Sequence, residues 1–502
     1  MFAGLLGPQV AVGRFNYLYF GTASSWRNPD NWFPQGAEAL VVSKAAPEGL
    51  GAPTKDREDN FGVGAALDEL IRLKRTAGFS FESYAIPGGA LGVQPDVHDF
   101  LVECCGMVHI SGTDTTVQAG STRTAINVAN ATAVPDNCMV LWEEGGEARH
   151  VMSDGNTPGV LTASQPFSVA PAAADNIRIL EAYWPDENRD AAGGSGTGKG
   201  GIAWLGVNGL QVRLNGVAAE KLSMSFGGDD AGKLSASVAA SEGEVVGGTT
   251  LKEAGGILAG DLAFDVGDDS IVPGDVSTTR TVSLTIFDPT DPANTLEHIK
   301  VRAVDGANRF TDVVRAQHGS GAVAHALDEV IVPYTPDRVF AGMPIPSIDG
   351  VIVIGSSEQA VDSPIKVEGG SLDVETPLLW EEDVHGTEWK RDRYAFGKRG
   401  YSFSMRGILE VDPNNDRTGL LGELFRDPAG SPRAVLVQQG DEGGSIHGFF
   451  LRKVFFESPD IDFSSELVSL ALKGKGKAPT PTPGIGTPAG GPGYGEGCIY
   501  FG

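Results

Sequence analysis

Three residue patterns could carry chemistry, and a glycine-rich run is the first of them. Residues 193–200 resemble the phosphate-binding loop G-x-x-x-x-G-K-[ST], which needs Ser or Thr after its lysine to hold magnesium, yet Gly200 follows Lys199. That loop also lies between a buried strand and a helix, whereas residues 202–205, Ile-Ala-Trp-Leu, are typical of a strand. We therefore expect a flexible glycine loop and no cofactor.

Histidines and paired acidic residues are the other two patterns. His318 and His325 lie seven positions apart in a Gly/Ala-rich run, where Asp312 or Asp328 could supply a third metal ligand. A metal site also needs a fixed scaffold, so we favour ordinary turn and strand histidines. We expect the acidic pairs in solvated turns, because glycosidase chemistry needs a defined separation between carboxylates across a cleft. These pairs are Glu143-Glu144, Asp229-Asp230, Asp268-Asp269 and Glu381-Glu382.

Signatures of catalysis are missing from the sequence. It contains no G-x-S-x-G nucleophile elbow, no H-E-x-x-H zinc motif and no obvious Cys–His nucleophile arrangement. We therefore predict a protein that is not an enzyme, with no catalytic, cofactor-binding or metal-binding residues. Four cysteines in 502 residues cannot form a disulfide scaffold. We expect Cys104 and Cys105 to be buried and structural, and Cys138 and Cys498 are isolated.

Composition narrows the function further. The chain has 65 acidic and 38 basic residues, a formal charge of −27. This excess argues against a general nucleic-acid binder, which needs a cationic surface, and against docking on an anionic membrane. No stretch approaches the ~20 apolar residues that cross a bilayer, and we expect no signal peptide in residues 1–12. A hydrophobic content of 41% suffices for packed cores, and the length predicts two to four domains.

Alternation of apolar and polar residues predicts a mainly β protein. Segments 211–214, 221–226, 233–238 and 281–286 place apolar side chains on one face and mostly Ser, Lys, Arg or Thr on the other. This two-residue period is typical of half-buried antiparallel strands, and the Gly, Asn and Asp clusters between such segments suit turns.

Two alternating segments belong to an internal repeat. Residues 78–84, Gly-Phe-Ser-Phe-Glu-Ser-Tyr, precede a predicted helix over about 95–105. Residues 400–405, Gly-Tyr-Ser-Phe-Ser-Met, precede another over about 418–426. Both helices carry an apolar stripe at helical spacing. The repeat predicts two related units on one chain.

The remaining segments complete the predicted organisation. Two of them suit small five- or six-strand modules, and the Gly/Pro-rich end suits an extended, disordered-like tail. The predicted boundaries are 1–112 with 183–250 for the first unit, including a long surface loop over 27–62; 113–182 and 251–339 for the two inserted β modules; 340–473 for the second unit; and 474–502 for the tail.

These features resemble the tail tube proteins of long-tailed bacteriophages. The similarity lies in the strand and proline-led helix over 78–106 and in the hairpin over 209–240. The run over 315–325 is similar to an R-G-x-x-G-T-x-A-x-x-H stretch of phage structural proteins, although Ala316 and Ser320 depart from it.

The resemblance implies a structural virion protein with two antiparallel β-barrel or sandwich tube domains, each with a short flanking helix. Proteins of this family form rings that stack into a tube for DNA passage. Three chains would then supply six tube domains to a pseudo-sixfold ring, around an acidic channel that does not bind DNA specifically. The expected partners are further copies of the chain and other tail proteins, such as tape-measure and terminator proteins, in the virion and, during assembly, in the host cytoplasm; no membrane is expected.

Other functions stay open. A distal tail or baseplate ring would use similar contacts in one terminal ring. A β-rich adhesin or glycan-binding protein would use exposed aromatic platforms, for which Trp26, Trp32, Trp184 and Trp389 are candidates. A polysaccharide-cleaving enzyme would need acidic residues in a deep cleft.

Overall fold

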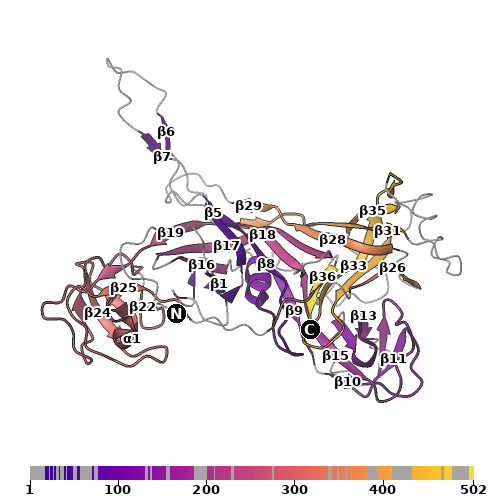
Figure 1. Cartoon of the computed structure of the whole chain (residues 1–502), viewed down its shortest axis with the longest axis horizontal. Coiled ribbons are helices and arrows are strands. Elements are labelled where there is room, and N and C mark those ends of the chain that lie inside the picture. Colours follow the sequence, from indigo (N-terminus) through magenta and orange to yellow (C-terminus); the bar gives the residue numbers. More distant parts are fainter. Residues whose placement is uncertain are drawn as a thin grey trace.

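The computed structural model describes residues 17–21, short segments between 23 and 72, and then 77–185, 201–336, 342–380, 394–409, 432–476 and 497–502, with brief gaps inside the longer ranges. It has 57% of its residues in strands and 4% in helices, which confirms the predicted mainly β fold. Figure 1 shows an elongated central body with one small lobe at one end and a second lobe below the other.

One antiparallel sheet, here called the main sheet, forms the spine of the body. Its strands follow the order β5-β8-β18-β17-β28-β31-β35, each paired with the next. Buried and half-exposed residues alternate along β8, as the two-residue period predicts. The bounds are β5 (Val42–Glu48), β8 (Ala77–Tyr84), β17 (Leu210–Gly227), β18 (Lys233–Ala240), β28 (Ile365–Glu375), β31 (Gly400–Leu409) and β35 (Ser469–Gly476).

A second layer packs on the buried face of the main sheet. A continuous cluster of buried apolar side chains lies between the layers and extends through both halves of the body. In the first half this layer contains β1 (Tyr17–Gly21), β4 (Ala39–Leu40), β16 (Gly201–Val207), the first part of β17, and β19 (Glu242–Val246). In the second half it contains β26 (Val351–Ser356), β27 (Gln359–Asp362), β32 (Arg433–Gln439), β33 (His447–Phe456) and β36 (Gly497–Phe501).

The first predicted helix is present but shorter than expected. Helical turns begin at His98, and a π-helical turn spans Phe100–Cys104 before Gly106, whose φ of 67° suits glycine, ends it. Phe100 is fully buried, with its ring centroid 4.8 Å from that of Phe20 and 5.0 Å from that of Phe81. The turn thus anchors the two layers. The second predicted helix, over 418–426, lies outside the described residues.

Cysteines behave as small apolar side chains in this core. Cys104, Cys105, Cys138 and Cys498 are all buried, and none of them forms a disulfide. A Cβ on Gly201 would lie 2.7 Å from the Cys104 sulfur, so the strand that crosses the helix requires glycine at this point.

Two peripheral six-stranded units correspond to the predicted modules. In barrel 1, the strands pair in the order β10-β15-β12-β13-β14-β11, and a bridge between Val117 and Val128 closes the ends. In barrel 2, the order is β20-β25-β22-β23-β24-β21, closed by a bridge between Leu251 and Val266. The strands are β10 (Thr115–Thr116), β11 (Ala125–Asn127), β12 (Cys138–Trp142), β13 (Glu147–Ser153), β14 (Val160–Ala163) and β15 (Asn176–Pro185), and β20 (Thr249–Thr250), β21 (Phe264–Asp265), β22 (Val282–Phe287), β23 (Glu297–Val304), β24 (Arg309–Val314) and β25 (Val330–Pro333).

The two barrels have the same topology, which sequence inspection missed. Thr115 pairs with Ile177 in barrel 1, and Thr249 pairs with Ile331 in barrel 2. The hydroxyl oxygen of each of these threonines accepts a hydrogen bond from a backbone N–H that follows the closing bridge, at 3.1 Å in barrel 1 and 2.8 Å in barrel 2. Ala174 and Asp328 lie three residues before Ile177 and Ile331, respectively, and both have a positive φ, of 78° and 69°. The chain therefore contains a second duplicated unit beside the one that the strands over 78–84 and 400–405 indicate.

The end of the chain corrects one expectation. Within the predicted tail over 474–502, β35 continues to Gly476, and β36 (Gly497–Phe501) is a fully buried strand between β15 and β33. The apolar run Cys498-Ile499-Tyr500-Phe501 explains this burial, since it follows the Gly/Pro-rich stretch and can join a core. Residues 477–496 lie outside the described residues.

The predicted loop over 27–62 also contains strands. β4 pairs with β1, and β5 pairs with β8, while Val42 and Ala45 pack against the central core. In the described part of the chain, three small hairpins lie outside the main sheet, namely β2 (Ala23–Ser25) with β3 (Asn28–Pro29), β6 (Thr54–Asp56) with β7 (Leu70–Arg72), and β29 (Leu378–Trp380) with β30 (Tyr394–Phe396).

Phe100 provides a test of the interlayer core. We expect Phe100→Ala to destabilise the first half of the body by about 3–5 kcal/mol, because a buried aromatic ring is lost and leaves a cavity. Hydrogen exchange should accelerate in β1 and β8, whereas Leu258→Ala, at a residue 70% exposed, should leave exchange there unchanged. Equal exchange in the two variants would contradict the anchoring role.

Candidate assembly interface

The junction of the two halves is a backbone ladder between β17 and β28. The register runs from Lys221 opposite Glu375 to Gly227 opposite Gly369. The Lys221 Nζ lies 3.5 Å from Asp373 Oδ1 and 3.6 Å from Glu375 Oε1 across this junction. The halves therefore share one hydrogen-bonded sheet.

The repeat strands occupy equivalent places in the two halves. β8 lies between β5 and β18, and β31 lies between β28 and β35. In β8 the rings of Phe79 and Phe81 face the core, and in β31 those of Tyr401 and Phe403 do so, each at most 3% exposed. The predicted repeat thus forms the same strand in the same orientation twice.

Because equivalent strands follow one another in the same order in both halves, the two edges of the main sheet differ from each other. If β5 corresponds to β28, and β18 to β35, the junction joins the last strand of one unit to the first strand of the next. Such a head-to-tail contact is heterologous, so it leaves one edge of each kind unused. Within the described part of the chain, β5 pairs only with β8, and β34 (Asp460–Asp462) pairs only with β35.

The β34 edge carries both protective charges and an exposed apolar group. Asp460 and Asp462 are exposed, and Phe463, directly after the strand, is 75% exposed. Charged residues keep an edge strand soluble, whereas an exposed phenylalanine beside unpaired backbone groups is typical of a contact surface.

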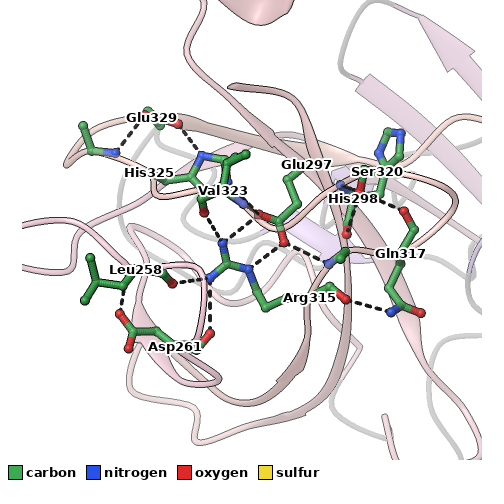
Figure 2. A network of polar contacts seen from close by, with 12 residues as sticks. Leu258, Asp261, Glu297, His298, Arg315, Gln317, Ser320, Val323, His325 and Glu329 are labelled. Carbon is green, nitrogen blue, oxygen red and sulfur yellow. Dashed lines mark hydrogen bonds and ion pairs between the residues drawn. The ribbon is translucent and has the colours of Figure 1, made fainter. Parts of the chain in front are cut away.

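A buried ionic network organises barrel 2, as Figure 2 shows. The Arg315 guanidinium donates two hydrogen bonds of 2.7 Å to the carboxylate of Glu297, at the start of β23. Arg315 also donates to the carbonyl oxygens of Leu258, Asp261 and Val323, at 2.9, 3.2 and 2.6 Å. One arginine therefore holds two loop segments, the turn over 258–261 and the segment at Val323, against one strand.

His325 extends the network to a second carboxylate. Its Nδ1 lies 2.6 Å from Glu329 Oε2 and its Nε2 lies 3.1 Å from Glu297 Oε2. The imidazole ring thus bridges the two carboxylates.

These contacts locate the predicted histidines. His318 lies in a turn at φ 49°, with its Nε2 2.9 Å from the Ser283 hydroxyl, and His325 lies in a short β-bridge with Ile257. Among the described residues no group of three His, Cys, Asp or Glu side chains is placed to hold a metal ion. The run over 315–325 is instead a structural clasp, both ends of which contact Glu297.

The remaining sequence candidates are dispersed. Glu143 and Glu144 accept hydrogen bonds from Arg178 and Asn176, and Asp268 accepts one from the backbone of Ser270. Trp184 is fully buried, so it cannot serve as a glycan platform. The glycine run over 193–200, the pairs Asp229-Asp230 and Glu381-Glu382, and Trp26, Trp32 and Trp389 lie outside the described residues.

A polar cluster that includes the first helical residue, His98, was not foreseen from the sequence. His98 Nδ1 lies 2.8 Å from the Tyr183 hydroxyl, and His109 hydrogen-bonds Glu181. Burial, and then the neighbouring His109, lower the pKa of His98 to about 4, so its ring is neutral at pH 7. The four residues are spread over three segments, and no local spacing identifies them.

Two comparisons, with protein-family models and with curated proteins, give no match. No protein-family model matches the chain, and no curated protein matches it. Within the described residues, no helix has the length and apolar character that crossing a membrane would need.

The network in barrel 2 predicts a dependence of stability on pH. Burial alone would raise the pKa of Glu297, but hydrogen bonds from Arg315, His325 and two backbone N–H groups lower it from 4.5 to about 2. Because the folded pKa is depressed, this stabilisation is present above about pH 4.5 and is lost as the pH falls towards 2.

Hydrogen exchange in β23 and β25 measures this effect. Protection should fall between pH 4.5 and 2 more than in barrel 1. Glu297→Gln should lower the stability of barrel 2 by about 3–5 kcal/mol at pH 7, because Arg315 loses its buried partner. Glu143→Gln, at a surface pair in barrel 1, is the matched control and should change little. Unchanged protection of barrel 2 in Glu297→Gln would refute the clasp.

Proposed function

We propose that the chain is a structural subunit of a bacteriophage tail, which assembles head to tail into rings of the tail tube. The head-to-tail pairing of β17 with β28 carries this proposal. This strand pairing occurs once within the chain, and the same kind of pairing would join further copies of the chain.

The free edges support this assembly. β5 of one chain would pair with β34 of the next, as β28 pairs with β17 within the chain. Strand addition between edges supplies backbone hydrogen bonds to both chains. A heterologous contact that closes forms a ring, and three chains would supply six units.

The barrels would lie outside the shared wall. Each packs its core against the second layer and not against the exposed face of the main sheet, through residues such as Tyr19 and Trp204 for barrel 2 and Phe450 and Tyr500 for barrel 1. The exposed face would then line the channel for DNA. The expected partners are further copies of the chain and other tail proteins, in the virion.

Electron microscopy of the purified protein tests the assembly. Rings or tubes with six repeated units from three chains are expected at high concentration. A strictly monomeric particle would contradict the proposal, and one ring per virion would instead assign the chain to a distal tail or baseplate ring.

Phe463 provides a point test of the edge contact. We expect Phe463→Glu to reduce ring formation at least tenfold at a given concentration, because a charge replaces the exposed ring beside β34. Leu258→Glu, on barrel 2 and similarly exposed, should leave ring formation unchanged. Light scattering reports assembly and thermal unfolding reports folding, so the two measurements together separate a loss of assembly from a loss of folding. If both variants form rings equally well, the β34 edge is not part of the contact between chains.

A further inference from the structure

The strand β36 contributes alternate side chains to two different cores. Ile499 and Phe501 belong to the central core between the two layers. Cys498 and Tyr500 belong to the core of barrel 1, and the Tyr500 hydroxyl donates a hydrogen bond of 2.9 Å to the carbonyl oxygen of Val437. β36 therefore fills a slot between β15 and β33, and both cores are incomplete without it.

Glycines allow β36 to lie close to its neighbours in this slot. A Cβ on Gly448 of β33 would lie 2.7 Å from the Tyr500 hydroxyl oxygen, and a Cβ on Gly497 would lie 2.3 Å from the carbonyl oxygen of Phe450. Both distances are too short for a real Cβ, so each position requires glycine. The slot is thus shaped for the extended segment that occupies it.

In the first half of the body, the strand equivalent to β36 follows its predecessor directly. β18 and β19 pair with β17 one after the other, with Ala239 opposite Ala218 and Glu242 opposite Asn215. Ser241 alone separates the end of β18 from the start of β19. A single residue is therefore enough to connect these two strands.

The second half has the same arrangement with a much longer connection. β35 and β36 pair with β33 one after the other, with Gly476 opposite Val454 and Gly497 opposite Leu451. Positions 452 and 453 of β33 lie between these pairs, yet 496 − 476 = 20 residues connect the two strands. Two or three extended residues would span such a gap. Relative to the first half, residues 477–496 are an insertion that the fold of one chain does not require.

We propose that copies of the chain exchange β36, so that the slot between β15 and β33 of one copy is filled by the β36 of a second copy. This link goes beyond the ring contact of the proposed function, because it uses neither β5 nor β34. A chain of 20 residues spans roughly 25 Å as a random coil and at most about 70 Å when extended. A small domain is about 30 Å across, so the connection reaches a neighbouring copy.

Exchange preserves the contacts that hold the strand. The β36 of a second copy has the same sequence, so it buries the same side chains and forms the same two ladders. The concentration of a chain's own strand at its slot is on the order of millimolar for a flexible connection. Neighbouring copies at a similar concentration therefore compete with it, and the release of an exchanged strand requires both ladders to break.

A disulfide across the slot identifies the chain that supplies β36. Phe450→Cys places a second thiol directly opposite Cys498, at a Cα separation of about 4.5–5.5 Å that a disulfide bridges. After oxidation of a concentrated sample by copper–phenanthroline, non-reducing denaturing electrophoresis should show covalently linked chains. Their yield should exceed that of the control Phe450→Cys/Cys498→Ser at least tenfold. A strand retained by its own chain would give monomers.

Shortening of the connection is a second test that leaves both cores intact. Deletion of residues 479–492 leaves 20 − 14 = 6 connecting residues, which still span the gap within one chain but reach at most about 20 Å. The matched control replaces the same 14 residues by Gly and Ser. Both carry Phe463→Glu, which weakens the proposed ring contact, and tagged and untagged copies are mixed at about 1 mM and diluted.

A tagged copy should retain untagged copies at least tenfold better with the control connection than with the shortened one. Monomers alone in the disulfide test, or equal retention by the two connections, would each overturn the proposal. Exchange that occurs in a protein without rings would contradict the proposed ring assembly alone. Rings without linked chains would contradict the exchange alone.

Discussion

The backbone ladder between β17 and β28 is the constraint on which the rest of the molecule depends. An unpaired strand edge in water attracts other strands, and each half alone would present two such edges. The ladder satisfies one edge of each half with seven residue pairs, from Lys221–Glu375 to Gly227–Gly369. It also sets the direction of the whole sheet, and thereby determines which edges stay available at β5 and β34.

Local periodicity was sufficient to predict the strands but not their partners. The alternation over 78–84 and 400–405 correctly identified both repeat strands and the faces that they bury, because side chains alternate within a strand whatever its neighbours. The pairing of β36 with β15 joins residues more than 300 positions apart, and no local signal encodes it. The Gly/Pro-rich stretch before β36 concealed the apolar run that follows.

For the clasp of barrel 2, too, the sequence indicated some of the residues but not their partner. His325 was noticed from its spacing to His318, and Arg315 as the start of the run over 315–325. Glu297, which contacts both, lies on a different strand and has no distinguishing neighbours in the sequence. In barrel 1 the equivalent Glu147 accepts its arginine bond from Arg149 of the same strand. One topology thus holds its loops with arginines from different positions, so the shared fold was invisible in the residues themselves.

β17 has a mechanical consequence that follows from its length. Its first part belongs to the second layer and its last part to the main sheet, so one continuous strand of 18 residues connects both layers. Antiparallel hydrogen bonds run perpendicular to the strand. A pull along β17 would therefore stress all bonds to β28 together in shear, and rupture would require them to fail at once instead of opening one after another.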